Sequence, residues 1–292
     1  MLRRLLTLTL TLFFISCEKE LDIKPNEVAP MLAVDASIES GQSPRVILTR
    51  SFNYFQTLSL ADLNNAFIRG ANVTISDGSN TQKLVEYNVP FAGGNLTYYS
   101  TDSSLGAAQL VGKMNTRYTL SIEAEGKTYS AATTIPDTLR KMDSIWWKQA
   151  PENKDTTKVV LFATISDPKG LGNYIRYFTR INDSAYLPGL TSVFDDVLVD
   201  GTSYTSQIDA GVDRNKPIEL EEYGFFRKGD TVSVKLSNID KTTFDFWRTW
   251  EQNQSNIGNP FSVPVKVLGN IPGALGYFGG YANQVKTLIV PK

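Results

Sequence analysis

Histidine is missing from this 292-residue sequence, and cysteine occurs once, as Cys17. The absence of histidine excludes Ser-His-Asp and Cys-His catalysis, histidine-ligated zinc, and the usual proton shuttle near neutral pH. A single cysteine excludes a disulfide within the chain. Glycoside hydrolysis by an acid pair and calcium binding need only carboxylates, but the spacing of the acidic residues nominates no pair. We therefore expect a protein that is not an enzyme and has no cofactor or metal.

Clusters of basic residues and long apolar runs are also missing. The chain has 29 Lys and Arg against 30 Asp and Glu, so it provides no positive surface for nucleic acid. The apolar stretch at residues 5–15 is shorter than the roughly 20 residues that a helix needs to span a bilayer. Glycines and prolines interrupt the apolar tail at residues 259–281. The composition is that of a globular protein with enough chain for two domains.

Cys17 ends a stretch that has the features of a secretion signal. Arg3 and Arg4 precede the apolar residues 5–15, and the small Ser16 comes directly before Cys17. The letters FISC at positions 14–17 resemble the bacterial lipobox, in which diacylglycerol alkylates the cysteine thiol. An ordinary signal peptide with a chance cysteine is the alternative. We expect residues 1–16 to be a lipoprotein signal peptide and Cys17 to carry acyl chains such as palmitate, which hold a protein durably at a membrane.

Residues 17–30 are polar, charged and proline-containing, which predicts a tether between the lipid and the first domain. Glu18, Glu20 and Asp22 follow the cysteine closely. This resembles the acidic stretch that directs lipoproteins of Bacteroidota to the outer face of the outer membrane. A solvated linker is the alternative. We expect an outer-membrane lipoprotein that faces the cell surface, although a periplasmic orientation stays open.

Residues 31–136 have the pattern of a β-sandwich of the immunoglobulin or fibronectin kind. Residues 45–49 and 72–76 read as strands, and Asp77-Gly78 predicts a hairpin turn toward residues 83–87. A second hairpin turns at residues 125–127. Since the disulfide that often joins such sheets is absent, the core must depend on apolar side chains. We expect Val73, Ile75, Tyr118 and Leu120 among them.

Residues 137–292 predict a second β-rich domain. Residues 159–165 alternate as a strand, residues 167–170 form a turn, and the next strand places Tyr174, Arg176, Phe178 and Arg180 on one face. Residues 232–236 form a further strand.

One α-helix is expected at residues 240–254. Thr242 and Asp245 have the spacing of a capping box, and Phe244, Trp247 and Trp250 recur at nearly helical spacing. We interpret this aromatic stripe as core rather than as a ligand platform.

Several motifs together resemble a known family. They are GANVTI at residues 70–75, the segment from Tyr118 to Pro136, GNY at 172–174, and the tail motifs NPFSVPV, GNIPG and GYFG between residues 259 and 279. The pattern is similar to that of a Bacteroidota lipoprotein family, domain of unknown function 4249, over nearly the whole mature chain. Members are typically encoded near TonB-dependent outer-membrane receptors. The resemblance implies an accessory surface lipoprotein, and it provides no catalytic residue to transfer.

The tail also provides the candidate binding residues. Phe261, Tyr277 and Phe278 offer flat apolar surface among glycines that permit close backbone approach, so a ligand or partner could dock there. We favour a structural loop packed on the second sheet, because no charged group converges on the stretch.

Two further patterns involve acidic residues. Five triplets resemble the Asp-Ser/Thr-aliphatic motif for O-glycosylation in exported Bacteroidota proteins, although Asp followed by Thr and an aliphatic residue also often begins a strand. The candidate sites are Thr138, Ser144, Thr156, Ser184 and Thr231. Asp195, Asp196 and Asp200 could contribute to a calcium site. Their spacing does not match an EF-hand, and we favour a solvated acidic loop.

The resulting hypothesis is a non-enzymatic accessory protein of a TonB-dependent uptake system, which captures an unknown substrate or docks on the receptor. A structural or adhesive module of the cell envelope is the second hypothesis, and a glycosidase with a carboxylate pair is the third.

Overall fold

A computed structural model describes residues 29–53, 56–91, 93–151, 153–257, 261–263 and 265–292. Cys17, the predicted signal peptide and most of the predicted tether lie outside these residues. The described chain is mostly β, as predicted, and none of its helices is long and apolar enough to cross a membrane. Its elements are β1 (Leu32–Glu39), β2 (Arg45–Arg50), α2 (Leu60–Ala66), β3 (Asn72–Ser76), β4 (Thr81–Lys83), β5 (Val85–Phe91), β6 (Gly94–Ser100), the 3-10 helix η2 (Ser103–Ala108), β7 (Thr116–Ala124), β8 (Lys127–Ile135), β9 (Lys141–Gln149), β10 (Lys158–Ser166), β11 (Tyr174–Ile181), β12 (Leu187–Phe194), β13 (Ser203–Ile208), β14 (Phe226–Arg227), β15 (Thr231–Ile239), α3 (Lys241–Ser255) and β16 (Leu275–Ile289).

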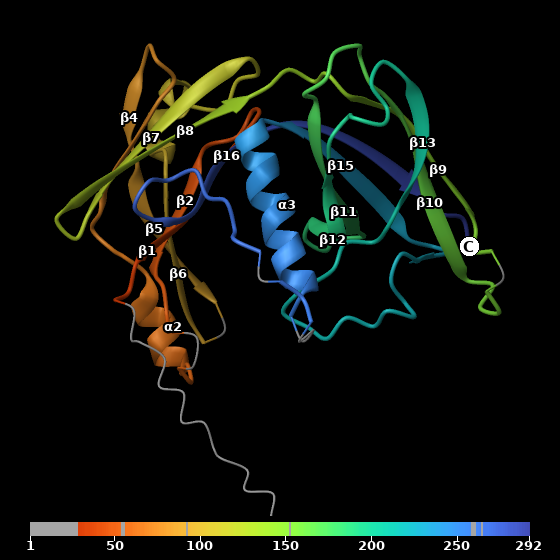
Figure 1. The fold of residues 1–292 in the computed structure, drawn as a ribbon, viewed down its shortest axis with the longest axis horizontal. Helices are drawn as coiled ribbons and strands as arrows, with labels where there is room; N and C mark the ends of the chain where they lie inside the picture. The colour runs from red at the N-terminus through yellow and green to blue at the C-terminus, as the bar shows by residue number, and fades with distance from the viewer. Residues whose placement is uncertain (1–28, 54–55, 92, 152, 258–260, 264) are drawn as a thin grey trace, which may run out of the picture.

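One large sheet runs through the molecule in the order β12-β11-β15-β16-β1-β2-β6-β5 (Figure 1). A sheet of β4, β3, β7 and β8 packs on one half of it and encloses the first hydrophobic core. A sheet of β9, β10, β13 and β14 packs on the other half and encloses the second core. The protein is therefore built as two β-sandwiches that share one sheet.

The long strand β16 joins the two sandwiches. Its first half pairs in parallel with β1, and its second half pairs antiparallel with β15. Phe278 lies in the first core, whereas Leu288 packs on the second. At Gly276 a Cβ would overlap the carbonyl oxygen of Val34, and φ is +94°, so the close pairing with β1 requires glycine there. The last strand of the predicted second domain thus completes the first sandwich. The predicted boundary between two domains near residue 137 stays a prediction.

The first core contains the residues that the sequence predicts. Val73, Ile75, Tyr118 and Leu120 are all fully buried. The hairpin after Asp77-Gly78 is formed by β3 and β4. One expectation needs correction, because residues 83–87 do not form a single returning strand. At the buried Leu84 the chain leaves the small sheet, and β5 continues in the large one.

Helix α3 covers the outer face of the large sheet beside β11, β12 and β16. It confirms the predicted helix, but the predicted capping box of Thr242 and Asp245 is wrong. Asp240 is the N-cap, and its carboxylate accepts hydrogen bonds from Thr243 N at 2.8 Å and from Thr134 N of β8 at 2.9 Å. Asp240 is favoured as the N-cap because its carboxylate accepts hydrogen bonds from backbone N–H groups of both the helix end and the neighbouring strand β8.

The aromatic residues of α3 belong to a third cluster of buried side chains, with Phe244 buried and Trp247 and Trp250 half-buried. The interpretation of the stripe as core is confirmed. The sequence analysis missed α2, although Ser59 and Asp62 form a capping box at its start.

Candidate functional site

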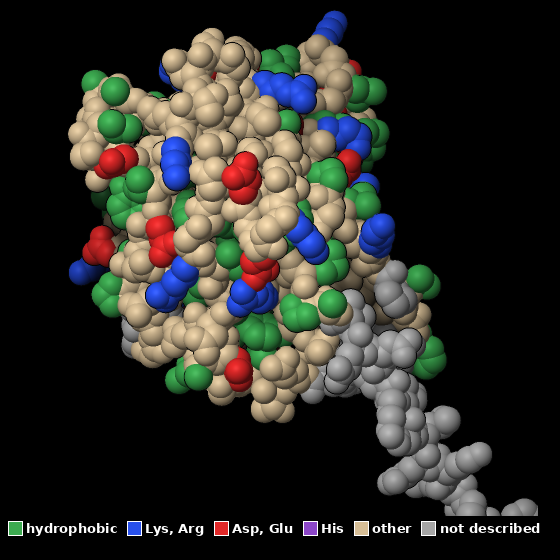
Figure 2. All heavy atoms as spheres, turned by 90° about the vertical axis from the view of Figure 1, so that its left-hand side faces the viewer, with side chains coloured by type: hydrophobic (Ala, Val, Ile, Leu, Met, Phe, Trp, Pro, Cys, Tyr) green, Lys and Arg blue, Asp and Glu red, His purple; other side chains and the backbone are tan. Residues whose placement is uncertain are grey.

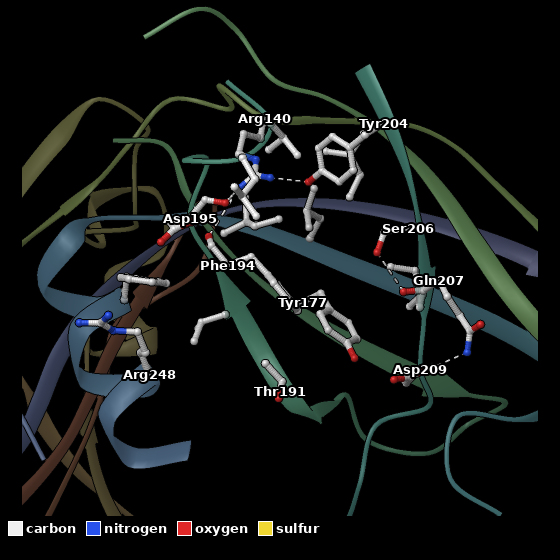
Figure 3. Close-up of a pocket in the computed structure, with 18 of the residues that line it drawn as sticks. Arg140, Tyr177, Thr191, Phe194, Asp195, Tyr204, Ser206, Gln207, Asp209 and Arg248 are labelled. Carbon is white, nitrogen blue, oxygen red and sulfur yellow. Dashed lines mark hydrogen bonds between the residues drawn. The ribbon is translucent and has the colours of Figure 1, made fainter. Parts of the chain in front are cut away.

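A pocket of about 670 Å³ opens in the second sandwich, between β11 and β12 of the large sheet and β13 of the small one (Figure 3). Both β12 and β13 are edge strands, so the sandwich is open along this side. The volume lies within the usual range for small-molecule sites, about 300–1,000 Å³. The lining residues are mainly apolar or aromatic and include Ile165, Ile175, Tyr177, Leu190, Val193, Phe194, Leu198, Tyr204, Ile208, Tyr223, Leu236 and Phe244.

The strand pattern of β13 explains one wall. Tyr204, Ser206 and Ile208 alternate with the more exposed Ser203, Thr205 and Gln207, so the first three face inward, and Gln207 lines the pocket at its edge. At the mouth, Leu198 lines the pocket while remaining 93% exposed. The exposed Asp195 and Arg248 also line the pocket, so its exposed rim combines apolar and charged side chains.

Polar groups gather at one end of the pocket. Figure 3 shows the Tyr177 hydroxyl directed toward the end where Gln207 and Asp209 lie. Gln207 Nε2 donates to Asp209 Oδ1 at 3.0 Å, and the Tyr223 hydroxyl accepts from Leu190 N at 3.1 Å. Burial strongly raises the pKa of Tyr177 and also raises that of Tyr223. Both phenols are therefore protonated at neutral pH and can donate hydrogen bonds.

Gly189 of β12 makes room for this arrangement. A Cβ at that position would overlap the Tyr177 hydroxyl. The glycine thus leaves room for the hydroxyl end of Tyr177 beside the edge strand.

Arg140 forms the opposite end of the pocket and is fully buried. Its Nε lies 3.1 Å from Asp167 Oδ1, Nη1 donates to the Asp195 carbonyl at 2.9 Å, and Nη2 donates to the Tyr204 hydroxyl. Burial raises the pKa of Asp167. The hydrogen bond from Gly201 N and the charge of Arg140 lower it, but they offset only part of the increase. The guanidinium is held by this ion pair and by its Nη hydrogen bonds, while Nε makes no hydrogen bond within the described chain, so Arg140 frames one end of the pocket.

Asp167, Asp196 and Asp200 lie together behind this end, with one oxygen from each within 4.8 Å of the others. Backbone N–H groups hold all three carboxylates: Gly201 N binds Asp167, Gly172 N and Asn173 N bind Asp196, and Gly170 N binds Asp200. A cation placed here would face the charge of Arg140. The prediction of a solvated acidic loop is wrong for Asp196, which is 1% exposed and is bound, like Asp200, to the turn before β11. Asp195 binds Val197 N in its own loop.

The predicted tail site is not formed. Tyr277 is 5% exposed and stacks on Phe246 with ring centroids 4.4 Å apart, and Phe278 is 0% exposed within the first core. The expectation that these two aromatics offer a docking surface is wrong, because α3 covers one face of β16 and the first sandwich covers the other. Phe261 lies apart from them and is 94% exposed.

The glycosylation candidates differ in accessibility. Ser144, Thr156 and Ser184 are exposed, whereas Thr138 and Thr231 are half-buried. Three of the five triplets therefore offer the open position that a bulky glycan requires.

Sequence reasoning did not find the pocket. Its polar groups come from the residue before β9, from β11, β12 and β13, from the segments after β12 and β13, and from α3, and no short spacing connects them. The only signal was the inward alternation of Tyr204, Ser206 and Ile208.

Comparison with known proteins gives one family. The family described as domain of unknown function (DUF4249) matches residues 18–287, which is most of the chain. A search of curated proteins gives no match.

Proposed function

The chain belongs to the DUF4249 family, and we propose that it is a non-enzymatic binding protein that holds a small ligand in the pocket of its second sandwich. The observation that carries this proposal is the pocket itself: a cavity of about 670 Å³ with mainly apolar walls and polar groups at its two ends. Such a combination is typical of sites in which burial provides affinity and a few polar groups fix orientation.

The lining indicates the chemistry of the ligand. Ile175, Val193 and Phe194 favour an aliphatic or aromatic body. At the polar end, the Asp209 carboxylate accepts hydrogen bonds and the Tyr177 phenol donates them. A ligand with an apolar body and hydroxyl or amino groups at one end would satisfy both.

The location of the protein is part of the proposal. The FISC motif supports a lipid on Cys17, and the acidic residues after it support export to the surface of the outer membrane. We propose that the protein captures substrate there for a TonB-dependent receptor, as the family resemblance implies. A structural or adhesive module is the alternative, but it would have no use for a cavity of this size.

The carboxylate-pair hydrolase finds less support. Asp195 and Asp209 are the acidic residues among those that line the pocket. Asp195 is exposed and accepts a hydrogen bond within its own loop, and Asp209 accepts one from Gln207. The buried pair Asp167 and Asp196 is bound by Arg140 and by backbone groups and does not line the cavity.

A pocket-filling variant tests the proposal. Ser206→Phe places an aromatic ring inside the cavity, and Thr205→Phe places the same ring on the exposed face of the same strand as a matched control. The probe is the apolar dye anilinonaphthalene sulfonate, whose fluorescence rises in apolar cavities. We expect saturable binding to the parent and to Thr205→Phe, and loss of binding in a normally folded Ser206→Phe. Equal binding by both variants would contradict the pocket as the site.

A further inference from the structure

We infer that the α2 end of the protein lies against the lipid bilayer, with Leu60 and Leu63 of α2 at the headgroup level. The inference depends on the lipid anchor at Cys17, which is part of the proposed function, and it is independent of the pocket. It concerns which surface of the protein the membrane contacts.

Helix α2 buries Ala66 but turns its leucines toward the outside. Asn64 faces the protein, where its Nδ2 donates to Gly93 O at 3.0 Å and its Oδ1 accepts from Asn95 N at 3.2 Å. Leu60 and Leu63 face outward and are 64% and 44% exposed. A helix on a soluble surface normally turns its leucines inward and its polar residues outward. The reversed pattern indicates that the outer side of α2 meets an apolar environment.

The charge around α2 agrees with this. Asp62 is the charged residue of α2, and its carboxylate is occupied by the capping box, with Ser59 N at 2.9 Å and Ser59 Oγ at 2.6 Å. Apart from the ionised Asp62, whose carboxylate is engaged by the capping box, the side chains that α2 presents to the outside are leucines and uncharged groups, which can enter a headgroup layer at little desolvation cost.

The described chain begins at the same end. Met31 N donates to Ser51 Oγ at 2.9 Å, and Ser51 N donates to Met31 O at 2.8 Å, just after β2 and shortly before α2. Phe67, directly after α2, bridges back to Thr49 of β2. The start of β1 and helix α2 are thus neighbours.

The tether limits how far this end can be from the membrane. Residues 18–29 can extend by at most about 3.3–3.6 Å each, or roughly 40 Å in all. A lipid on Cys17 therefore keeps the α2 end within about 40 Å of the bilayer and holds the exposed leucines at high effective concentration beside it.

A second apolar group lies at the same end. Ile257 and Val263, in the segment that follows α3, are 69% and 79% exposed. Figure 1 shows that α3 ends at the lower end of the molecule, where α2 also lies, so Ile257, two residues after α3, is at that end. Asn256 Nδ2 donates to Val263 O at 3.4 Å, which keeps Val263 close to the end of α3. Figure 2 shows mixed positive and negative side chains over the neighbouring face. Contact with lipid would thus depend on apolar insertion more than on charge.

Site-specific fluorescence tests the inference. Because a lipidated Cys17 has no free thiol, a cysteine introduced into the mature lipoprotein is labelled uniquely. We compare Leu60→Cys with the matched control Leu171→Cys, which replaces a leucine of similar exposure, 69%, just before β11. The first residue of β11, Tyr174, pairs with Ile239, which comes just before α3. Leu171 therefore lies near the upper end of α3, at the end of the molecule away from α2. Each variant carries the dye NBD and is reconstituted into phosphatidylethanolamine and phosphatidylglycerol vesicles with or without shallow doxyl-labelled lipid.

Since apolar side chains at an interface lie about 5–10 Å into the headgroup boundary, NBD at position 60 should shift to the blue and be quenched by doxyl lipid. NBD at position 171 should show neither effect. Equal quenching at the two positions would overturn the inference, and so would a blue shift at 60 without lipid quenching, which would indicate cover by a second copy. Vesicle flotation comes first. Failure to float would overturn the anchor and this inference together, but would leave dye binding in the pocket unaffected.

Discussion

Replacing Arg140 by methionine should destabilise the protein strongly and distort the pocket. The guanidinium joins three parts of the second sandwich: Asp167 before β11, the backbone carbonyl of Asp195 after β12, and the Tyr204 hydroxyl on β13. Methionine can fill much of the same volume but makes none of these bonds. The carboxylate of Asp167, whose side chain is fully buried, then loses its nearest cation.

Removing one partner of a buried ion pair typically costs about 3–5 kcal/mol, because an uncompensated charge stays buried. This is a large part of the about 5–15 kcal/mol that stabilises a typical protein. Arg140→Lys should rescue little, since an ammonium group cannot reach the same acceptors as the planar guanidinium. Arg140→Met/Asp167→Asn should be more stable than Arg140→Met alone, because the double variant buries no unpaired carboxylate at that position.

The pH dependence has a definite sign. Burial raises the pKa of Asp167 above its value in the unfolded chain, and loss of the arginine charge would raise it further. A carboxyl group with a raised folded-state pKa contributes its full stability below the unfolded-state pKa, and that contribution is lost as pH rises through the folded-state pKa. Arg140→Met should therefore recover part of its stability relative to the parent when the pH is lowered from 7 toward 4.

Urea unfolding at several pH values, followed by tryptophan fluorescence, measures these effects. The reasoning is refuted if Arg140→Met loses less than about 1 kcal/mol at pH 7, the level of an exposed pair. If the double variant Arg140→Met/Asp167→Asn is no more stable than Arg140→Met, the lost stability comes from the other contacts of the guanidinium and not from the unpaired carboxylate.

Three further predictions concern other parts of the chain. Trp247→Ala should cost about 3 kcal/mol, because the indole donates to Tyr281 Oη at 2.9 Å and packs on Arg176; unchanged thermal melting would place the side chain outside the core. Burial raises the pKa of Tyr99 to about 12, so the parent should lose at most about 2 kcal/mol more than Tyr99→Phe between pH 10 and 12, and parallel curves would contradict this. Cys17→Ala should release a soluble or unprocessed form; labelling by radioactive fatty acid together with membrane fractionation of the variant would disprove lipidation at Cys17.

The regular local patterns of the sequence predict much of the fold. Val73 and Ile75, like Tyr118 and Leu120, alternate with less buried residues, and the pleat of a strand turns such a pattern directly into a core. The Asp77-Gly78 turn determines its hairpin locally, because glycine readily adopts the positive φ that the turn requires. Helix α3 follows from its aromatic spacing in the same way.

The features that depend on distant segments could not be predicted. Tyr277 and Phe278 have the composition of an exposed recognition loop, but β16 places one under α3 and the other in the first core. The cap of α3 is Asp240 because β8 supplies additional donors from more than 100 residues away. The pocket exists because the edges of two different sheets leave a gap, and periodicity along one strand carries no information about that gap.

Native mass spectrometry of the mature protein, purified from the membranes of expressing cells in mild detergent, tests the central claim most directly. The parent and Thr205→Phe should carry an additional small-molecule mass, and Ser206→Phe, folded to the same melting temperature, should be without it. The same additional mass on Ser206→Phe, or none on any of the three proteins across growth conditions, would contradict a ligand-binding role for the pocket.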